Sequence, residues 1–249
     1  MFGFRLKAFC VNFLSTFEFL LSTYRINYKI TVLERISLKK YTHIIWDWNG
    51  TLLNDAWLCV DVMNQMLRER RLPAISLEIY RDIFDFPVRD YYLKLGFDFT
   101  LEPFEKVGME FMILYNRRQK ECSLHDEVYT LLSEIQKKGY PQSILSAREQ
   151  NELRQETKNL KVFDFFDKVY GLDDHYAHGK TDVGIRLLDD LKAPKDKVIF
   201  IGDTRHDSEV ADELGIDCIL IPNGHHSEKS LMKLNKPIMH SINDLLPLL

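Results

Sequence analysis

Short apolar runs alternate with helical segments after residue 40, and this alternation constrains the fold more than any other feature of the sequence. Most of the runs end in a polar turn, and the segments between them carry apolar residues at helical spacing. The expected strands cover residues 41–47, 142–146, 168–172, 197–202 and 217–221, and the expected helices cover residues 125–138, 182–191, 207–214 and 241–248. Repeated strand–helix units predict an α/β fold: a parallel sheet with helices on both faces, which is a three-layer α/β/α core.

Residues 56–121 interrupt the alternation, because nothing in them resembles a further strand of that sheet. Four stretches there have helical patterning, namely residues 56–70, 77–84, 88–95 and 101–120. Gly96 follows the third stretch, where it is suited to end a helix. We therefore predict an all-helical insertion between the first and second strands of the sheet.

Charge is unevenly distributed along the chain. The 249 residues have a formal net charge of −4, but residues 1–40 hold seven basic and two acidic side chains, which gives +5 and leaves −9 for the rest. A body this acidic lacks the positive surface field of a general nucleic-acid binder, so we do not expect nucleic acid as a partner. The 45% hydrophobic and 28% charged residues are ordinary for a globular protein and exclude wholesale disorder.

The basic amino-terminal extension, residues 1–40, is rich in Phe and Leu. Its apolar run from Phe9 to Leu21 contains Asn12 and Glu18 and is shorter than the roughly 20 residues of a membrane-spanning helix. Membrane contact through an amphipathic surface helix is an alternative, but we favour an extension that packs on the body or adds nothing to the chemistry. The four cysteines form no C-x-x-C pair, which favours a reducing, cytoplasmic location.

Polar side chains stand at the ends of the expected strands. Asp47 ends the first strand, and Ser146 ends the second. Lys180 opens a helix, and Asp203 and Asp207 follow the fourth strand. We expect them at one edge of the sheet, because function in such sheets lies at the carboxyl ends of the strands. Together they offer a carboxylate nucleophile, a hydroxyl donor, a fixed cation and a divalent-metal site, which is the set that phosphoryl transfer needs.

The same residues lie in four ordered motifs: WDWNGTL at 46–52, ILS at 144–146, Lys180, and IGDTRHD at 201–207. These motifs resemble those of the haloacid dehalogenase-like superfamily. The resemblance covers residues 41–249 and implies a Rossmann-like core, residues 41–55 and 122–249, with a mobile helical cap, residues 56–121. A cap at this place resembles the branch that contains phosphoglycolate phosphatase and β-phosphoglucomutase.

The resemblance also assigns roles. It implies that Asp47 is the nucleophile and a Mg²⁺ ligand, with the main-chain carbonyl of Asn49 and the Asp203 carboxylate as further ligands. Asp207 supports the metal indirectly, and Ser146 and Lys180 bind the phosphoryl group. The implied function is that of a Mg²⁺-dependent phosphohydrolase, which acts on a small phosphorylated metabolite through an aspartyl-phosphate.

Asn49 departs from the family pattern, which usually has Asp two positions after the nucleophile to protonate the leaving group. An amide cannot supply that proton, and general acid–base catalysis is typically worth about 10²–10⁴-fold. Three interpretations remain open. The substrates have good leaving groups, as acyl or aryl phosphates do; water or another residue such as His206 replaces the acid; or the chain is a catalytically weakened protein that binds phosphate compounds or acts in regulation. A phosphomutase is disfavoured, because both of its half-reactions need proton transfer at residue 49.

Other polar residues are interpreted as solvated. His175 and His178 lie in a polar loop, where exposure is favoured over metal binding. His225 and His226 follow the last long strand, near the expected mouth of the site, and are also expected to be solvated. Arg148 is interpreted as an exposed residue at a helix start, in preference to a contact for a substrate anion.

Overall fold

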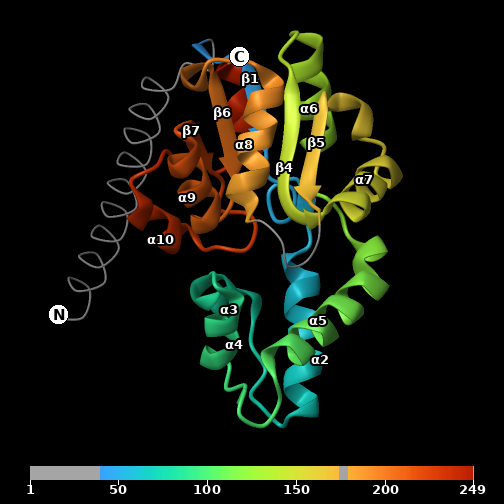
Figure 1. The fold of residues 1–249 in the computed structure, drawn as a ribbon. Coiled ribbons are helices and arrows are strands. Elements are labelled where there is room, and N and C mark those ends of the chain that lie inside the picture. Colours follow the sequence, from blue (N-terminus) through green and yellow to red (C-terminus); the bar gives the residue numbers. More distant parts are fainter. Residues whose placement is uncertain (1–39, 174–178, 249) are drawn as a thin grey trace, which may run out of the picture. The chain divides into compact units, whose positions relative to one another are not determined.

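The computed structural model describes residues 40–173 and 179–248 (Figure 1). The predictions for residues 1–39 of the basic extension, and those for His175 and His178, lie outside the described residues.

Five parallel strands form the central sheet in the order β5-β4-β1-β6-β7. Their bounds are β1 His43–Trp46, β4 Gln142–Glu149, β5 Lys168–Leu172, β6 Val198–Gly202 and β7 Asp217–Leu220. Every residue of β1 and β6 is buried, as expected for inner strands of a parallel sheet that is covered on both faces. Trp46 of β1 pairs with Ile144 on one side and Ile201 on the other, so the carboxyl end of β1 lies between those of β4 and β6.

Helices cover both faces of this sheet. They are α6 Val128–Lys137, α7 Gln150–Asn159, α8 Lys180–Leu191 and α9 Arg205–Leu214. In Figure 1, α8 lies in front of the sheet and α6 lies behind it. Ile45 and Phe200 of the sheet share one core cluster with Val183 and Leu187 of α8 and with Leu214 of α9. The predicted three-layer α/β/α fold is confirmed.

The helical insertion contains α2 Ala56–Glu69, α3 Leu77–Ile83, α4 Val88–Lys94 and α5 Phe104–Arg118. These four helices match the four predicted stretches, although α5 begins three residues late, directly after Pro103. The chain enters and leaves the insertion through an antiparallel ribbon of two short strands, β2 Leu53–Asn54 and β3 Ser123–Leu124. The sequence did not predict this ribbon, because strands of two residues show no periodicity.

Three further elements differ from the prediction. β4 continues to Glu149, three residues past Ser146, and its pairing with β5 is irregular after Leu145. α7 begins at Gln150, two residues after the helix start expected near Arg148, and its extent was not predicted, because its sequence QNELRQETKN holds a single large apolar residue. α6 begins at Val128 instead of 125, because Glu127 has a φ of 70°, a left-handed conformation that cannot continue into a helix. The closing segment is a short α10, Glu228–Leu231, and a 3₁₀ helix, Ile242–Leu248.

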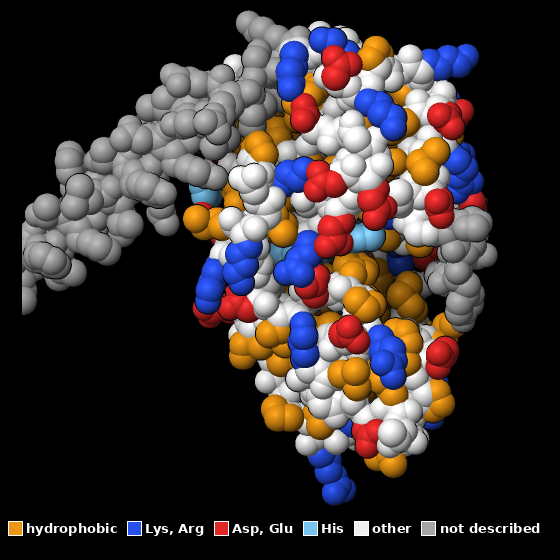
Figure 2. Space-filling model, turned by 60° about the vertical axis from the view of Figure 1, so that its left-hand side comes forward, with side chains coloured by type: hydrophobic (Ala, Val, Ile, Leu, Met, Phe, Trp, Pro, Cys, Tyr) orange, Lys and Arg blue, Asp and Glu red, His pale blue; other side chains and the backbone are white. Residues whose placement is uncertain are grey.

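Surface side chains differ between the core and the insertion. On the face shown in Figure 2, basic and acidic side chains are interspersed, and hydrophobic side chains gather over the lower part, where α2–α5 lie. Most exposed large hydrophobic residues of the described chain belong to the insertion: Trp57, Ile79, Phe86, Leu93, Leu101, Met109 and Ile113. Within the described ranges, no helix has the length and apolar character that crossing a membrane requires.

Candidate active site

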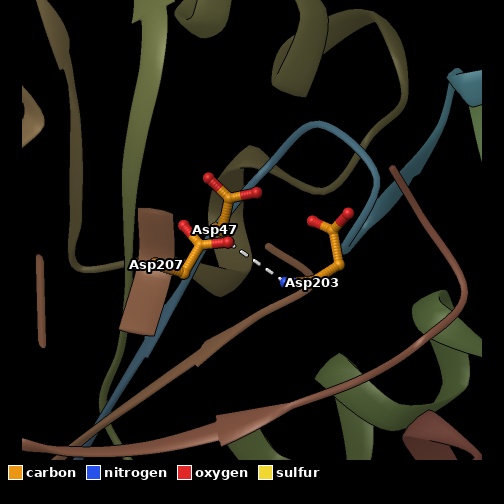
Figure 3. Close-up of side chains that lie close together, drawn as sticks. All are labelled: Asp47, Asp203 and Asp207. Atoms are coloured by element: carbon orange, nitrogen blue, oxygen red, sulfur yellow. Dashed lines mark hydrogen bonds between the residues drawn. The ribbon is translucent and has the colours of Figure 1, made fainter. Parts of the chain in front are cut away.

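The carboxyl ends of β1 and β6 bring two aspartates together. Asp47 follows β1 directly, and Asp203 follows β6, the strand that pairs with β1 along its whole length. Asp207 comes from the first turn of α9. One carboxylate oxygen of each residue lies within 4.8 Å of the other two, and Figure 3 shows the three carboxylates gathered at the strand ends. All three side chains are buried.

Lys180, the first residue of α8, supplies a positive charge to this group. Its Nζ atom donates hydrogen bonds to Asp47 Oδ1 and, over 2.6 Å, to Asp207 Oδ1. The second oxygen, Asp207 Oδ2, accepts the main-chain N–H groups of Asp203 and Thr204 and the Thr204 hydroxyl. Asp207 therefore fastens Lys180 to the loop after β6. We call Asp47, Lys180, Asp203 and Asp207 the strand-edge cluster.

Asp203 is closely surrounded by main chain. Its Oδ1 accepts the Thr51 hydroxyl over 2.9 Å, and its Oδ2 accepts the main-chain N–H of His225 over 2.6 Å. A Cβ atom at Gly224 would lie 2.1 Å from Asp203 Oδ2, and a Cβ atom at Gly50 would lie 2.4 Å from it. Gly50 also has a φ of +76°. Both positions therefore require glycine to admit the Asp203 carboxylate.

The strand-edge cluster carries more negative charge than its lysine balances. Burial raises the pKa of Asp47 to about 8; Lys180 opposes this, while the Asp207 and Asp203 charges add to it. Burial and the Asp207 charge likewise raise the pKa of Asp203 to about 6, against the effect of His225. Burial disfavours the charged form of Lys180, but Asp207 and Asp47 outweigh it and raise its pKa above the usual value. The cluster therefore favours a further cation.

The donor set of the cluster suits Mg²⁺. This ion prefers oxygen ligands and is usually held by one or two carboxylates together with substrate oxygens. Asp47 and Asp203 place carboxylate oxygens within the 4.8 Å grouping, and the main chain of Asn49 belongs to the same loop, two residues after Asp47. The residues present therefore fit the cofactor that the sequence predicts.

The side chain of Asn49 takes part in a different network. Its Nδ2 donates to Asp55 Oδ2 over 2.8 Å and to the Tyr115 hydroxyl over 3.1 Å. Tyr115, in α5, itself donates to Asp55 Oδ2, and the main-chain N–H of Gly50 donates to Asp55 Oδ1. His225 Nε2 lies 3.4 Å from Asp55 Oδ1. We call Asn49, Asp55, Tyr115 and His225 the Asp55 cluster.

Both histidines that follow β7 are buried, so the prediction that they are solvated is wrong. His225 Nδ1 shares a hydrogen bond of 2.9 Å with the Tyr80 hydroxyl of α3. Burial disfavours the charged form of His225, but Asp55 outweighs it and raises the pKa to about 9; His225 in turn lowers the pKa of Asp55. Burial lowers the pKa of His226 to about 4. The sequence could not show that the insertion covers this loop.

Ser146 and Arg148 lie on β4, the neighbour of β1, and both are buried. The Ser146 hydroxyl accepts the N–H of Arg148, and within the described chain it makes no hydrogen bond to the strand-edge cluster. The predicted exposed Arg148 is wrong: its guanidinium donates to Glu156 and to Asn116 of α5, each over 2.8 Å. Glu156 also accepts the indole N–H of Trp48. This buried network joins α5 and α7 to the loop after β1.

His206, considered as a substitute proton donor, lies in α9. Its ring packs against Phe86 with the ring centroids 4.7 Å apart. Burial lowers the pKa of His206 and so favours its neutral form.

Three residues of the site were missed by sequence reasoning, namely Thr51, Asp55 and Tyr115, and His225 was interpreted as solvated. Thr51 carried one signal, its place inside the motif at 46–52. Asp55 directly precedes α2, a position typical of an N-cap. Its carboxylate caps no N–H of α2 and instead accepts hydrogen bonds from residues 49 and 50.

The chain thus combines a parallel α/β core, helices inserted after the first strand, and a buried lysine with three carboxylates beside the strand ends. The sequence profile of the haloacid dehalogenase-like hydrolase family matches residues 44–221. The chain belongs to this family, which confirms the resemblance seen in its motifs.

Similar proteins agree with this assignment. The chain is 23% identical to pyrophosphatase PpaX of Bacillus mycoides over 229 residues, 84% of this chain and 97% of that protein. It is 24% identical to phosphoglycolate phosphatase of Photorhabdus laumondii, over 84% of this chain and 92% of that protein. A haloacid dehalogenase-like hydrolase from Streptococcus pneumoniae has a similar structure, with a TM-score of 0.72, 23% identity, and coverage of 84% of this chain and 98% of that one. The structural likeness confirms the fold, and the relatives bear out a phosphatase-type hydrolase.

Proposed function

We propose that the protein is a Mg²⁺-dependent phosphohydrolase that acts on a small phosphorylated metabolite through an aspartyl-phosphate on Asp47. One observation carries the proposal: Lys180 bridges Asp47 and Asp207 beside Asp203, in a buried cluster at the strand ends. Such a cluster fixes a nucleophile and a cation where a phosphoryl group carries its charge. Asp47, Asp203 and the main-chain carbonyl of Asn49 would hold Mg²⁺, which supplies charge neutralisation at the phosphoryl oxygens.

The proposed reaction has two halves. An Asp47 oxygen attacks phosphorus, its new O–P bond forms as the bond to the leaving group breaks, and the leaving oxygen takes the electron pair. Water then attacks the phosphorus of the aspartyl-phosphate, the Asp47 O–P bond breaks to restore the carboxylate, and the released inorganic phosphate keeps the water protons. Lys180 keeps its charge throughout, because its pKa lies above the usual value. Ser146 is the proposed hydroxyl contact for the phosphoryl group.

Asn49 directs the proposal toward substrates with good leaving groups. Its amide cannot protonate a departing alkoxide, and its Nδ2 is already committed to Asp55 and Tyr115. Phosphoanhydrides, aryl phosphates and acyl phosphates need little protonation of the leaving oxygen. The names of the pyrophosphatase relatives agree with this class, whereas phosphoglycolate would be the harder substrate. The insertion, residues 56–121, is the proposed cap that selects the substrate.

The decisive experiment compares the full chain with Asp47→Asn on pyrophosphate, p-nitrophenyl phosphate and 2-phosphoglycolate, with MgCl₂ or with a chelator. We expect Mg²⁺-dependent turnover that is fastest on the first two substrates, and a loss of about 10⁴-fold or more in Asp47→Asn. Asp189→Asn, which removes the same charge from the surface of α8, is the matched control. Mass spectrometry of acid-quenched protein should find the phosphoryl group on Asp47. Absence of turnover on all three substrates, or full activity of Asp47→Asn, would overturn the proposal.

A second candidate follows from the same residue: a protein that binds phosphate compounds but turns them over slowly. Asn49 favours it, because it removes the usual acid and leaves the proposed Mg²⁺ ligands in place. Tight binding of inorganic phosphate with Mg²⁺, together with no turnover on the substrates above, would select this candidate.

A further inference from the structure

Asp55 accepts hydrogen bonds from two consecutive residues of the loop after β1. Asp55 Oδ1 accepts the main-chain N–H of Gly50 over 2.9 Å, and Asp55 Oδ2 accepts Asn49 Nδ2 over 2.8 Å. The residue is 1% exposed. Both of its oxygens are therefore directed at the loop that carries the proposed nucleophile, away from the helix start it precedes.

This contact determines which side-chain chemistry is compatible with position 49. An ionised carboxylate only accepts hydrogen bonds, so it selects the amide nitrogen of Asn49 and turns the amide oxygen to the opposite side. An aspartate at 49 would place two carboxylates in contact with no hydrogen between them. Like charges at such short range in a buried place are strongly unfavourable.

Asp55 also connects the loop to both ends of the insertion. It immediately precedes α2, where the chain enters the insertion, and it accepts the hydroxyl of Tyr115 from α5, near the point where the chain leaves. Through Asp55, a shift of α2 or α5 would therefore change the orientation of the Asn49 side chain.

We propose that Asp55 is a positioning residue for residue 49, and that the two form a matched pair in which the carboxylate belongs at 55 and the amide at 49. The kinetic part of this proposal rests on the proposed function, because it takes residue 49 to adjoin the reacting phosphoryl group. The pairing itself rests on the contacts alone. Asn49→Asp by itself should therefore fail to improve the enzyme, although it restores the family's usual acid.

The test is a cycle of four proteins: the unmodified chain, Asn49→Asp, Asp55→Asn, and the variant that carries both changes and so exchanges the two side chains. We expect each single change to lower kcat on p-nitrophenyl phosphate by about 10-fold or more with KM changed less than about 3-fold, because the phosphate contacts stay in place. The exchanged pair should recover kcat to within about 3-fold, since an amide again faces a carboxylate. A residue with a merely structural role would give no such rescue.

Stability gives a readout that needs no activity. In urea unfolding, each single change should raise the unfolding equilibrium constant. If the two changes acted independently, the double variant would show the product of the two single increases. We expect its increase to be smaller than that product by at least about 10-fold, a coupling within the usual range for residues in contact. Peptide mass spectrometry must confirm residue 49 in each sample, because an Asn-Gly pair deamidates readily. Asp189→Asn again serves as the matched surface control.

If Asp55→Asn does not fold, Asn49→Ala replaces it: Ala loses the hydrogen bond without adding a charge, so Asn49→Asp must be less stable than Asn49→Ala. Additive effects in the cycle, or an Asn49→Asp variant as stable as Asn49→Ala, would overturn the pairing. Turnover by the unmodified chain with additive effects rejects the pairing and keeps the proposed function. Non-additive effects on stability, with no turnover by any of the proteins, would keep the pairing and reject the proposed function.

Discussion

The strand-edge cluster and the Asp55 cluster both bury carboxylates beside the same loop, but their charges are balanced differently. In the first, three carboxylates share Lys180, and the pKa values of Asp47 and Asp203 are raised to about 8 and about 6. In the second, Asp55 has its oxygens filled by N–H and O–H donors and faces His225, and its pKa is lowered. Negative charge is therefore in excess in the strand-edge cluster, where the chemistry is proposed. In the Asp55 cluster, which holds the loop after β1, it is compensated. Four further experiments test this contrast.

The largest effect is expected from Lys180→Met, which removes the one cation of the strand-edge cluster. The variant leaves buried carboxylates unpaired, so the free energy of unfolding should fall by about 3–5 kcal/mol. Turnover should fall by about 10²–10³-fold, because a fixed charge at the phosphoryl group is lost. Urea unfolding and kcat/KM measure the two effects, with exposed Lys138→Met as the control. Retention of wild-type stability would show that the cluster is not short of positive charge.

The second-largest effect on stability is expected when Mg²⁺ is added. Mg²⁺ at about 100 times its Kd should raise the free energy of unfolding by about 2.7 kcal/mol, since it binds the folded state alone. Asp203→Asn should lose most of this gain, whereas Asp55→Asn should lose much less, because Asp55 contacts residue 49 but supplies no proposed metal ligand itself. Thermal unfolding with and without MgCl₂ measures the gain. If Mg²⁺ stabilised the two variants equally, the strand-edge cluster could not be distinguished from the Asp55 cluster as the metal site.

Rising pH should weaken the Asp55 cluster. The folded-state pKa of His225 is raised to about 9, so its contribution to stability is fully present below pH 6.5 and is lost as pH rises through 9. His225 alone should therefore lower the stability of the metal-free protein by about 2–3 kcal/mol between pH 6.5 and 9. Asp47, with its raised pKa, acts in the same direction up to about pH 8.

One variant tests the His225 contribution to the pH dependence, and a second serves as its control. Asp55→Asn should remove the His225 part of the fall, because His225 loses its partner, and should leave the part that Asp47 contributes up to about pH 8. His43→Gln should not change it, since burial lowers the pKa of His43 to about 4, outside this pH range. Urea unfolding at each pH measures the slope. Stability that increases with pH over this range would contradict the assignment.

The smallest effect is expected at the loop that the two clusters share. Arg81 of α3 donates to the main-chain oxygens of Gly224 and Asn223, each over 2.8 Å. His225, in the same loop, contacts Asp203 through its main chain and Asp55 through its ring. Arg81→Met should lower the free energy of unfolding by about 1 kcal/mol in urea. Arg68→Met, at an exposed position, is the control. A loss of stability as large as that in Lys180→Met would show that this loop stabilises the fold as much as Lys180 does.

The two clusters also differ in how far the sequence predicted them. Asp47 and Asp203 could be placed together because adjacent parallel strands end at one edge, which is a rule of the fold. The Asp55 cluster depends on contacts between residues 49 and 55, Tyr115 in the insertion and His225 after the last strand. Hydrophobic periodicity carries no information about such contacts, so Asp55 receives no role from the sequence and His225 is interpreted as solvated. The ribbon β2–β3 was not predicted for a related reason, because strands of two residues are too short to show a hydrophobic alternation.

Asp47 lies between two tryptophans, and this gives the site an optical signal. Trp46 and Trp48 are fully buried, and each indole N–H is fixed, to Gln142 and to Glu156 respectively. The third tryptophan, Trp57, is partly exposed and belongs to α2. Any change of charge on the Asp47 carboxylate occurs one residue from two rigid fluorophores. Emission from Trp57→Phe protein should therefore report cation binding and phosphorylation at Asp47 in real time, without a labelled substrate.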